Sequence, residues 1–227
     1  MELKKELKEL LVEKGAVLVG IADMKGIANA KYSTGVAVGI PLPKSLIREL
    51  ENAPNEEYYR LYSDYNDKLN KIVLCGEEFL KEKGFEAYAQ TTDRVVIDDD
   101  RISPLPHKTV ATRAGLGWIG KNCLLVTPEY GPALRISSLL TNAPLECAEA
   151  IEDSKCGECN SCVECCPAKA LKGAVWKAGM KREEFVDANL CFDTQVQIME
   201  AKTGIKADLC GKCFARCQYT QKYLNTK

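Results

Sequence analysis

The sequence predicts an α+β fold of α/β type, in which a larger domain is followed by a small cysteine-rich module. Across the first 148 residues, short apolar runs alternate with amphipathic segments at helical spacing. After residue 148, eight of the twelve cysteines fall in two spaced runs. We therefore expect one domain over residues 1–148 and a metal-dependent module over residues 149–227.

Periodicity and chain breakers place the elements of the first domain. Leucines at helical spacing, closed by Gly15, predict an N-terminal helix. A long amphipathic helix is predicted over residues 56–83 and ends before Gly84. Its tyrosines are assigned to core packing rather than to a ligand pocket. Buried strands are predicted over the apolar runs 16–21, 35–40, 85–89, 124–126 and 134–140.

Eight cysteines have the spacing that holds two [4Fe–4S] clusters. The first run reads C-x2-C-x2-C-x3-C-P, in which three cysteines wrap one cluster and the fourth ligates the other. We assign a first ligand set, Cys156, Cys159, Cys162 and Cys217. The second ligand set is Cys166, Cys191, Cys210 and Cys213. The exchange of ligands between runs predicts that this module folds around its metal.

Other uses of the cysteines fit less well. A four-thiolate zinc site built from two C-x2-C pairs would leave half of the eight residues unexplained. Disulfides suit a secreted chain, but the N-terminus has no apolar signal core. Cys165 neighbours Cys166, and the proline that follows favours Cys166 as the ligand. The cysteines outside the runs, Cys75, Cys123 and Cys147, are predicted to be packed thiols.

Composition narrows the function and the compartment. Charged residues make up 28% of the chain and the formal net charge is −1, which argues against a strongly basic nucleic-acid binder. Lysines and arginines gather locally around residues 172–182 and 212–227; a solvated face or a tRNA contact would explain them. No apolar run is long enough to cross a membrane, and dense cysteines indicate a reducing compartment, so we expect a cytoplasmic protein.

A glycine-rich segment at residues 115–120 matches G-x-G-x-x-G, but its context argues against a dinucleotide site. That fingerprint follows a strand and opens a helix. Here residues 107–114 read as helix and residues 123–126 as strand, so the order is reversed. The glycines instead allow the backbone to approach a large flat ligand closely.

Three motifs in order resemble the epoxyqueuosine reductase family of cobalamin-dependent iron–sulfur enzymes. The segment from Ala114 to Asn122 resembles the family's AGLGW-x-GK motif. Residues 19–23 resemble its early VGI-x-D strand, and residues 166–171 its CPTGA[IL] motif. Residues 186–191 resemble VDARRC, which supports Cys191 as a ligand independently of spacing. The resemblance covers nearly the whole chain.

The resemblance implies a nitroreductase-like corrinoid-binding domain followed by a ferredoxin-like module with two [4Fe–4S] clusters. It implies that electrons pass through the clusters to a bound cobalamin, which reduces a small molecule or a modified nucleoside. An external donor of ferredoxin or flavodoxin type would supply the electrons. The implied cofactor-binding residues are Gly115, Leu116, Gly117, Trp118, Gly120 and Lys121. The family's C-terminal helical-repeat extension, which helps to hold tRNA, is not found in the sequence, and this weakens tRNA as a partner.

The catalytic residues depart from the family pattern. The family's proposed proton-donating aspartate corresponds to Arg101, and Asp100 would substitute for it only after a shift of the loop. His107, the only histidine, is a candidate proton donor or cobalt ligand, with helix capping as the alternative. Arg101 and Lys121 are candidate contacts to corrin amides or to an anionic substrate, unless they are simply exposed basic residues.

Three functions from different classes follow. A corrinoid-dependent reductase is the first, and it predicts cobalamin uptake. An electron-transfer protein, or a reductive activator of a corrinoid partner, would have clusters but no cobalamin of its own. A structural metal module would hold zinc and carry no visible chromophore.

Overall fold

The computed structural model describes residues 2–96, 98 and 101–226, which form two compact units built from interleaved segments. Unit 1 comprises Met1–Ile40, Asp64–Leu116 and Arg135–Ile151. Unit 2 comprises Pro41–Ser63, Gly117–Leu134 and Glu152–Lys227. The last boundary lies close to the one expected after residue 148, whereas two earlier segments group with the cysteine-rich residues.

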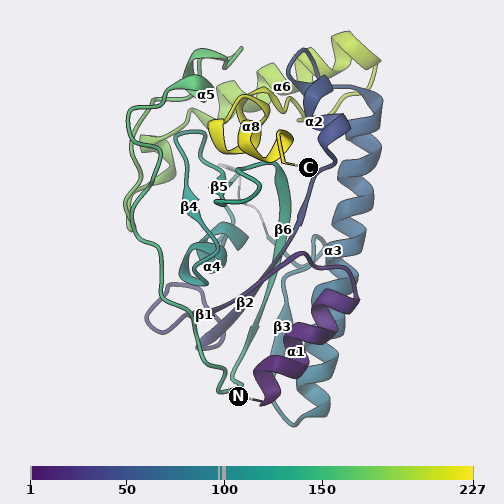
Figure 1. The fold of residues 1–227 in the computed structure, drawn as a ribbon, viewed down its shortest axis with the longest axis vertical. Helices are drawn as coiled ribbons and strands as arrows, with labels where there is room; N and C mark the ends of the chain where they lie inside the picture. The colour runs from purple at the N-terminus through teal and green to yellow at the C-terminus, as the bar shows by residue number, and fades with distance from the viewer. Residues whose placement is uncertain (1, 97, 99–100, 227) are drawn as a thin grey trace. The chain divides into compact units, whose positions relative to one another are not determined.

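A four-stranded sheet with the order β1-β2-β6-β3 organises unit 1 (Figure 1). Strand β1 (Leu18–Asp23) pairs antiparallel with β2 (Thr34–Pro41), and β3 (Ala87–Ala89) pairs antiparallel with β6 (Leu134–Thr141). All four strands were predicted from apolar runs, and their ends are shifted by up to two residues.

Helices α1 (Glu2–Glu13) and α3 (Glu56–Glu82) contribute to one core with the sheet, and both were predicted. Gly15, with φ of +104°, follows α1 in a conformation that favours glycine. Gly76 brings α3 close to β6, because a Cβ there would lie 2.7 Å from Leu139. The core that these elements share is built from Leu7, Leu11, Ile21, Val36, Val38, Leu69, Ile72, Val73, Leu80 and Leu139.

Helix α4 (His107–Arg113) packs on the other face of the sheet. Successive side chains of a strand point to opposite faces, so Gly20 and Gly35 face away from Ile21 and Val36 in the core. A Cβ at Gly20 would lie 2.8 Å from Ala114, and one at Gly35 would lie 2.7 Å from Val110. The two glycines therefore let α4 approach the sheet closely.

The glycine-rich segment lies between a helix and a strand, as predicted. Helix α4 precedes it, and β4 (Trp118–Ile119) pairs antiparallel with β5 (Leu125–Val126). This order is the reverse of a dinucleotide-binding turn, which confirms that the motif match is not a nucleotide fingerprint.

Unit 2 contains the cysteine-rich residues, several short helices and the β4–β5 pair. Its helices are α2 (Lys44–Leu50), α5 (Ser161–Glu164), α6 (Ala188–Thr203), α7 (Lys212–Ala215) and α8 (Gln218–Leu224), with a 3-10 turn at Arg182–Glu184. The Asp187 side chain accepts a hydrogen bond from the Leu190 N–H and caps the start of α6, while Gly204 in the left-handed conformation ends it. Tyr58 is buried and makes an edge contact with Phe214, which supports the assignment of this tyrosine to core packing.

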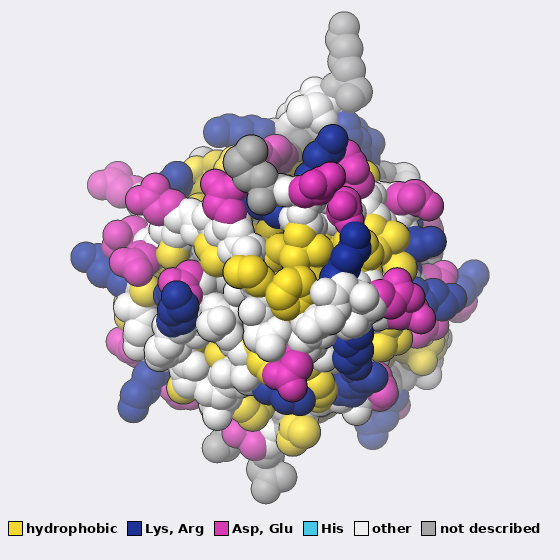
Figure 2. Space-filling model, turned by 90° about the horizontal axis from the view of Figure 1, so that it is seen from below, with side chains coloured by type: hydrophobic (Ala, Val, Ile, Leu, Met, Phe, Trp, Pro, Cys, Tyr) yellow, Lys and Arg dark blue, Asp and Glu magenta, His cyan; other side chains and the backbone are white. Residues whose placement is uncertain are grey.

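The charged surface is mixed. On the face drawn in Figure 2, lysine and arginine side chains alternate with aspartate and glutamate among the described residues. Within the part of the chain that the structure describes, no helix is both long and apolar enough to span a bilayer.

Candidate metal and redox site

The eight predicted ligands all lie in unit 2, on short helices or beside them. Cys162 lies in α5, Cys191 in α6 and Cys213 in α7, and Cys217 is the residue before α8. Gly157 has φ of +53°, so the chain turns in a left-handed conformation directly after Cys156. All twelve cysteines are described, and none forms a disulfide.

The thiols of the first ligand set are neighbours. Burial raises the pKa of the Cys162 thiol to about 12, and the nearby thiols of Cys217, Cys156, Cys165 and Cys159 add to the rise. Burial likewise raises the pKa of Cys217 to about 11, with Cys156 and Cys159 beside it. The structure therefore brings together the C-x2-C-x2-C run and a cysteine more than fifty residues later.

The thiols of the second ligand set are also neighbours. Burial raises the pKa of Cys191 to about 11, and the thiols of Cys166 and Cys210 add to the rise. Burial raises the pKa of Cys213 well above its ordinary value, and Cys210 and Cys191 add to the effect. The two strongest thiol neighbours of Cys162, Cys191 and Cys213 belong to the ligand set assigned from spacing, and Cys162 of the first set also acts on Cys213 of the second.

Cys165 is used differently from Cys166. Its Sγ lies 3.5 Å from the Cys162 carbonyl oxygen and 3.6 Å from the Lys212 carbonyl oxygen, so it donates to backbone. Cys166 is buried and lies beside Cys191. This geometry favours Cys166 as the ligand. Of the three cysteines outside the runs, Cys123 is buried as expected, while Cys75 and Cys147 are only partly buried.

These thiols are chemically suited to iron. Buried neutral thiols release their protons only when a cation takes the proton's place, and thiolates are the ligands of [4Fe–4S] clusters. Among the residues that the structure describes, no three His, Cys, Asp or Glu side chains are placed to hold a single metal ion. Eight cysteines are the number of ligands that two such clusters need.

Lys121 is buried, so the explanation of this residue as an exposed basic side chain is wrong. It is 5% exposed, and its Nζ donates a 3.0 Å hydrogen bond to Asn160 Oδ1. Asn160 directly follows Cys159, and its carbonyl accepts hydrogen bonds from Val163 and Glu164 at the start of α5. The sequence did not indicate a role for Asn160, although it lies inside the first cysteine run.

Trp118 lies in an aromatic contact beside the same cysteines. Its ring is 1% exposed and makes an edge contact with Tyr219, with 4.9 Å between ring centroids. Lys155 Nζ lies 5.7 Å from the Trp118 ring centroid, and the Tyr219 hydroxyl donates to the Lys155 carbonyl. Because Lys155 precedes Cys156 and Tyr219 follows Cys217 by two residues, this contact links both parts of the first ligand set.

The glycines of the 115–120 segment are explained by contacts within the chain. A Cβ at Gly117 would lie 2.1 Å from the Val126 carbonyl oxygen, and one at Gly120 would lie 2.6 Å from Asn122. Gly115 has φ of +68° and would meet the Glu149 carbonyl oxygen at 2.9 Å. Gly117, Trp118, Gly120 and Lys121 are covered by the protein's own atoms, which leaves Gly115 and Leu116 accessible.

His107 begins α4 and lies in a polar chain within unit 1. Its Nδ1 is 2.8 Å from Ser138 Oγ, which accepts a 2.6 Å hydrogen bond from Gln90 Nε2. Part of the ring is accessible, but burial of the imidazole lowers its pKa to about 4, and the Arg135 charge adds to this. The imidazole is therefore neutral near pH 7, so a proton donor there would have to be the neutral ring.

Of the other two candidate catalytic residues, Arg101 is described by the structure. Arg101 is exposed and has φ of +60°, and its N–H donates to the Asp98 carbonyl. Asp100 lies outside the described residues. Asp98 uses a side-chain oxygen to accept a 2.7 Å hydrogen bond from Ile102 N–H. An exposed side chain agrees with the simpler explanation offered for Arg101.

Several curated proteins that are similar in sequence to this chain are named epoxyqueuosine reductase. No family model matches the chain. Epoxyqueuosine reductase of Bacillus subtilis is 37% identical over 108 residues, which are 48% of this chain and 26% of that protein. Epoxyqueuosine reductase of Cyclobacterium marinum is 29% identical over 174 residues, which are 75% of this chain and 49% of that protein. The matches therefore span at most about half the length of these relatives.

Solved structures of two enzyme classes share the fold. An epoxyqueuosine reductase bound to a modified tRNA-Tyr stem loop covers 97% of this chain and 66% of its own, with a TM-score of 0.64 and 20% identity. A reductive dehalogenase described in terms of B12-dependent dehalogenation covers 93% of this chain and 30% of its own, with a TM-score of 0.67 and 18% identity.

The fold is thus the mixed α/β fold that epoxyqueuosine reductases and reductive dehalogenases share. Within that class, the sequence relatives are more specific. The chain is a homologue of the epoxyqueuosine reductases, as its motifs predicted, and these relatives are enzymes.

Proposed function

We propose that this chain is an iron–sulfur oxidoreductase related to epoxyqueuosine reductase, with two [4Fe–4S] clusters and a bound cobalamin. The observation that carries the proposal is that thiols far apart in the chain lie near one another, Cys217 near Cys162 and Cys166 near Cys191. Each set joins cysteines from distant parts of the chain, and each set matches the spacing rule for two-cluster ferredoxins.

The residues proposed to hold iron are Cys156, Cys159, Cys162 and Cys217 for one cluster and Cys166, Cys191, Cys210 and Cys213 for the other. When bound, such clusters accept and release single electrons at potentials set by charge, hydrogen bonds and exposure. The chain's part is to bury the thiols, to exclude water and to place hydrogen-bond donors beside them. Gln195 Nε2, which donates to Cys191 Sγ at 3.2 Å, is one such donor.

Cobalamin is proposed from the relatives rather than from the glycine-rich segment. The support is the similarity of fold to a dehalogenase described as B12-dependent. In this chain, most of the predicted cofactor-binding residues are covered by the protein itself, so they do not fit a direct contact with a corrin ring. We therefore assign no reaction step to cobalamin here.

The substrate class and the partners are also proposals, as cobalamin is. A relative was solved with an epoxyqueuosine-modified tRNA stem loop, which supports a modified nucleoside, free or in tRNA, as the substrate class. A small protein of ferredoxin or flavodoxin type is proposed as the electron donor. The density of reduced thiols supports a cytoplasmic location.

An experiment on purified protein tests the proposal. Anaerobic purification should give about eight irons and eight sulfides per chain, and added cobalamin should be retained stoichiometrically. Cys166→Ser should lose about half of the iron, while the matched Cys165→Ser should keep all of it. Zinc in place of iron, or full iron content in Cys166→Ser, would contradict the ligand assignment.

A second candidate is an electron-transfer protein, or a reductive activator of a corrinoid partner, without its own cobalamin. The observation that favours it is the burial of Gly117, Gly120 and Lys121 by the chain's own atoms. Full iron content without cobalamin uptake, together with rapid electron exchange with a corrinoid protein, would select this function over the reductase.

A further inference from the structure

We propose that Lys121 is the buried counter-charge of the iron–sulfur cluster held by the first ligand set and that it sets the reduction potential of that cluster. The inference rests on the proposed function, because it concerns a cluster that the first ligand set would hold. It assigns Lys121 a positioning and tuning role that differs from the contact to corrin or substrate expected from the motif.

Burial of Lys121 requires an anionic partner. An ammonium group loses much of its hydration when it is buried, and proteins compensate by pairing it with a negative charge. Lys121 is 5% exposed, and the partner that the structure gives it is a neutral amide, Asn160 Oδ1 at 3.0 Å. Among the described residues, no carboxylate forms an ion pair with it. Its counter-charge is therefore missing from the part of the polypeptide that the structure describes.

The position of Asn160 indicates where that counter-charge belongs. Asn160 lies between Cys159 and Cys162, and its carbonyl accepts the N–H groups of Val163 and Glu164 at the start of α5. Lys121 thus contacts the turn that carries two thiols of the first ligand set. Trp118 lies three residues before Lys121. Through Lys155 and Tyr219, it is linked to the segments that carry the other two thiols of the first ligand set, Cys156 and Cys217.

A cluster in the first ligand set supplies the missing charge. Four thiolates outweigh the positive charge of a [4Fe–4S] core, so the bound cluster is anionic in both oxidation states. Reduction adds one electron from the donor to the core, breaks no covalent bond and increases the negative charge. A buried cation nearby stabilises the reduced state more than the oxidised state, and so it raises the reduction potential.

The test is an anaerobic redox titration with dithionite and mediators, followed by electron paramagnetic resonance, on reconstituted full-length protein. Lys121→Met removes the charge and keeps most of the side-chain volume. We expect this variant to retain about eight irons. One of its clusters should be about tenfold harder to reduce, a shift of about 59 mV toward negative potential for a one-electron couple. Lys121→Arg keeps the charge, and its midpoint potentials should stay close to those of the wild type.

Two further variants separate charge from structure. Asn160→Asp leaves Lys121 in place but adds a carboxylate to neutralise it, so the midpoint potential should shift in the same direction as in Lys121→Met. Lys155→Gln removes an exposed charge one residue before Cys156 and should shift the potential less, because water screens it.

The measurements distinguish a failure of the role proposed for Lys121 from a failure of the proposed function. If the wild type holds zinc or no metal, the proposed function fails. If Lys121→Met holds its iron and both midpoint potentials are unchanged, the proposed function stands and the role of Lys121 is wrong. An equal shift in Lys155→Gln would also overturn it, since the effect would not depend on burial.

Discussion

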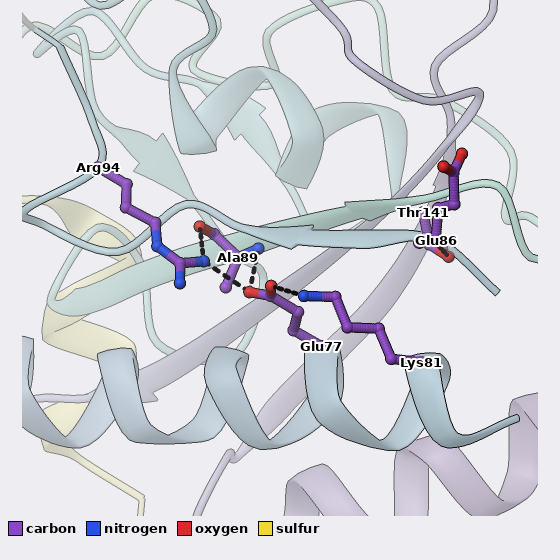
Figure 3. A network of polar contacts seen from close by, with 6 residues as sticks. All are labelled: Glu77, Lys81, Glu86, Ala89, Arg94 and Thr141. Carbon is purple, nitrogen blue, oxygen red and sulfur yellow. Dashed lines mark hydrogen bonds and ion pairs between the residues drawn. The ribbon is translucent and has the colours of Figure 1, made fainter. Parts of the chain in front are cut away.

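Glu77 in unit 1 and Lys121 in unit 2 are both buried charges, but their surroundings differ. Glu77 is 6% exposed and accepts hydrogen bonds from Arg94 Nη1 at 2.7 Å, from Ala89 N–H at 2.9 Å and from Lys81 (Figure 3). Lys121 is equally buried and has a neutral amide as its partner. A fully paired buried charge stabilises the fold, whereas a buried charge without a counter-ion indicates where a charged ligand belongs.

The largest expected effect comes from removing iron, which takes away the proposed counter-charge of Lys121. Structural metal sites contribute on the order of 10 kcal/mol of folding free energy. In iron-depleted protein, backbone amides of residues 152–227 should therefore lose most of their protection from hydrogen exchange. Amides around Glu77 should keep theirs, because no metal contributes to that network. Equal loss of protection in both regions would contradict this comparison.

Removing the charge of Glu77 should have the next largest effect. Glu77→Gln weakens the hydrogen bonds to Arg94 and to the Ala89 N–H, which should destabilise unit 1 by about 1–3 kcal/mol. Differential scanning calorimetry of holoprotein measures the change. The control is Lys5→Ala, which breaks the exposed Lys5–Glu9 pair and should cost under about 0.5 kcal/mol. A similar cost for both variants would mean that burial of Glu77 is unimportant.

The Glu77 carboxylate should also make the stability of unit 1 depend on pH. Burial raises the pKa of Glu77, but its bonds to Lys81, the Ala89 N–H and Arg94 outweigh burial and hold the pKa below its ordinary value of 4.5. The stabilisation is therefore present above about pH 4.5 and is lost as the pH falls toward the lower folded pKa. The stability difference between wild type and Glu77→Gln should shrink over that range, and a constant difference would contradict the assignment.

His107 represents a third case, a partly buried group that is neutral. Its folded pKa of about 4 lies below the ordinary value of 6.5, so between these values the unfolded chain binds a proton that the folded chain excludes. Stability should fall as the pH falls, by about 1.4 kcal/mol per unit. His107→Gln should be less sensitive by about 1 kcal/mol when melting is compared at about pH 6.5 and 5.5, because the unfolded imidazole is only half protonated at pH 6.5. Identical sensitivity would show that His107 does not titrate in this way.

The smallest effect concerns exposed charge near the thiols. Lys155→Gln should shift a cluster midpoint potential by less than Lys121→Met does, and the shift should disappear in about 1 M salt, where the screening length is about 3 Å. The shift caused by Lys121→Met should persist in salt. Equal salt sensitivity would place both lysines in the same environment.

The local sequence pattern predicted the helices and strands better than it predicted the candidate functional site. Helix α3, α4 and the strands follow from periodicity and from glycine and proline signals that act within a few residues. The ligand sets stay a prediction, drawn from a spacing of cysteines that reflects cluster geometry. The burial of Lys121 was not predictable, since it depends on Asn160, 39 residues away, and nothing near Lys121 in sequence signals that contact. The network of Glu77 was missed for the same reason.

The interleaving of the two units has a consequence for biosynthesis. Each unit needs segments that leave the ribosome before, between and after segments of the other. Unit 2 therefore cannot finish folding until residues 152–227 have been made, whereas unit 1 has all of its segments once residue 151 has left the ribosome. We expect cluster insertion to wait for the completed polypeptide, so the nascent protein would carry free thiols and depend on assembly factors that shield them from oxygen.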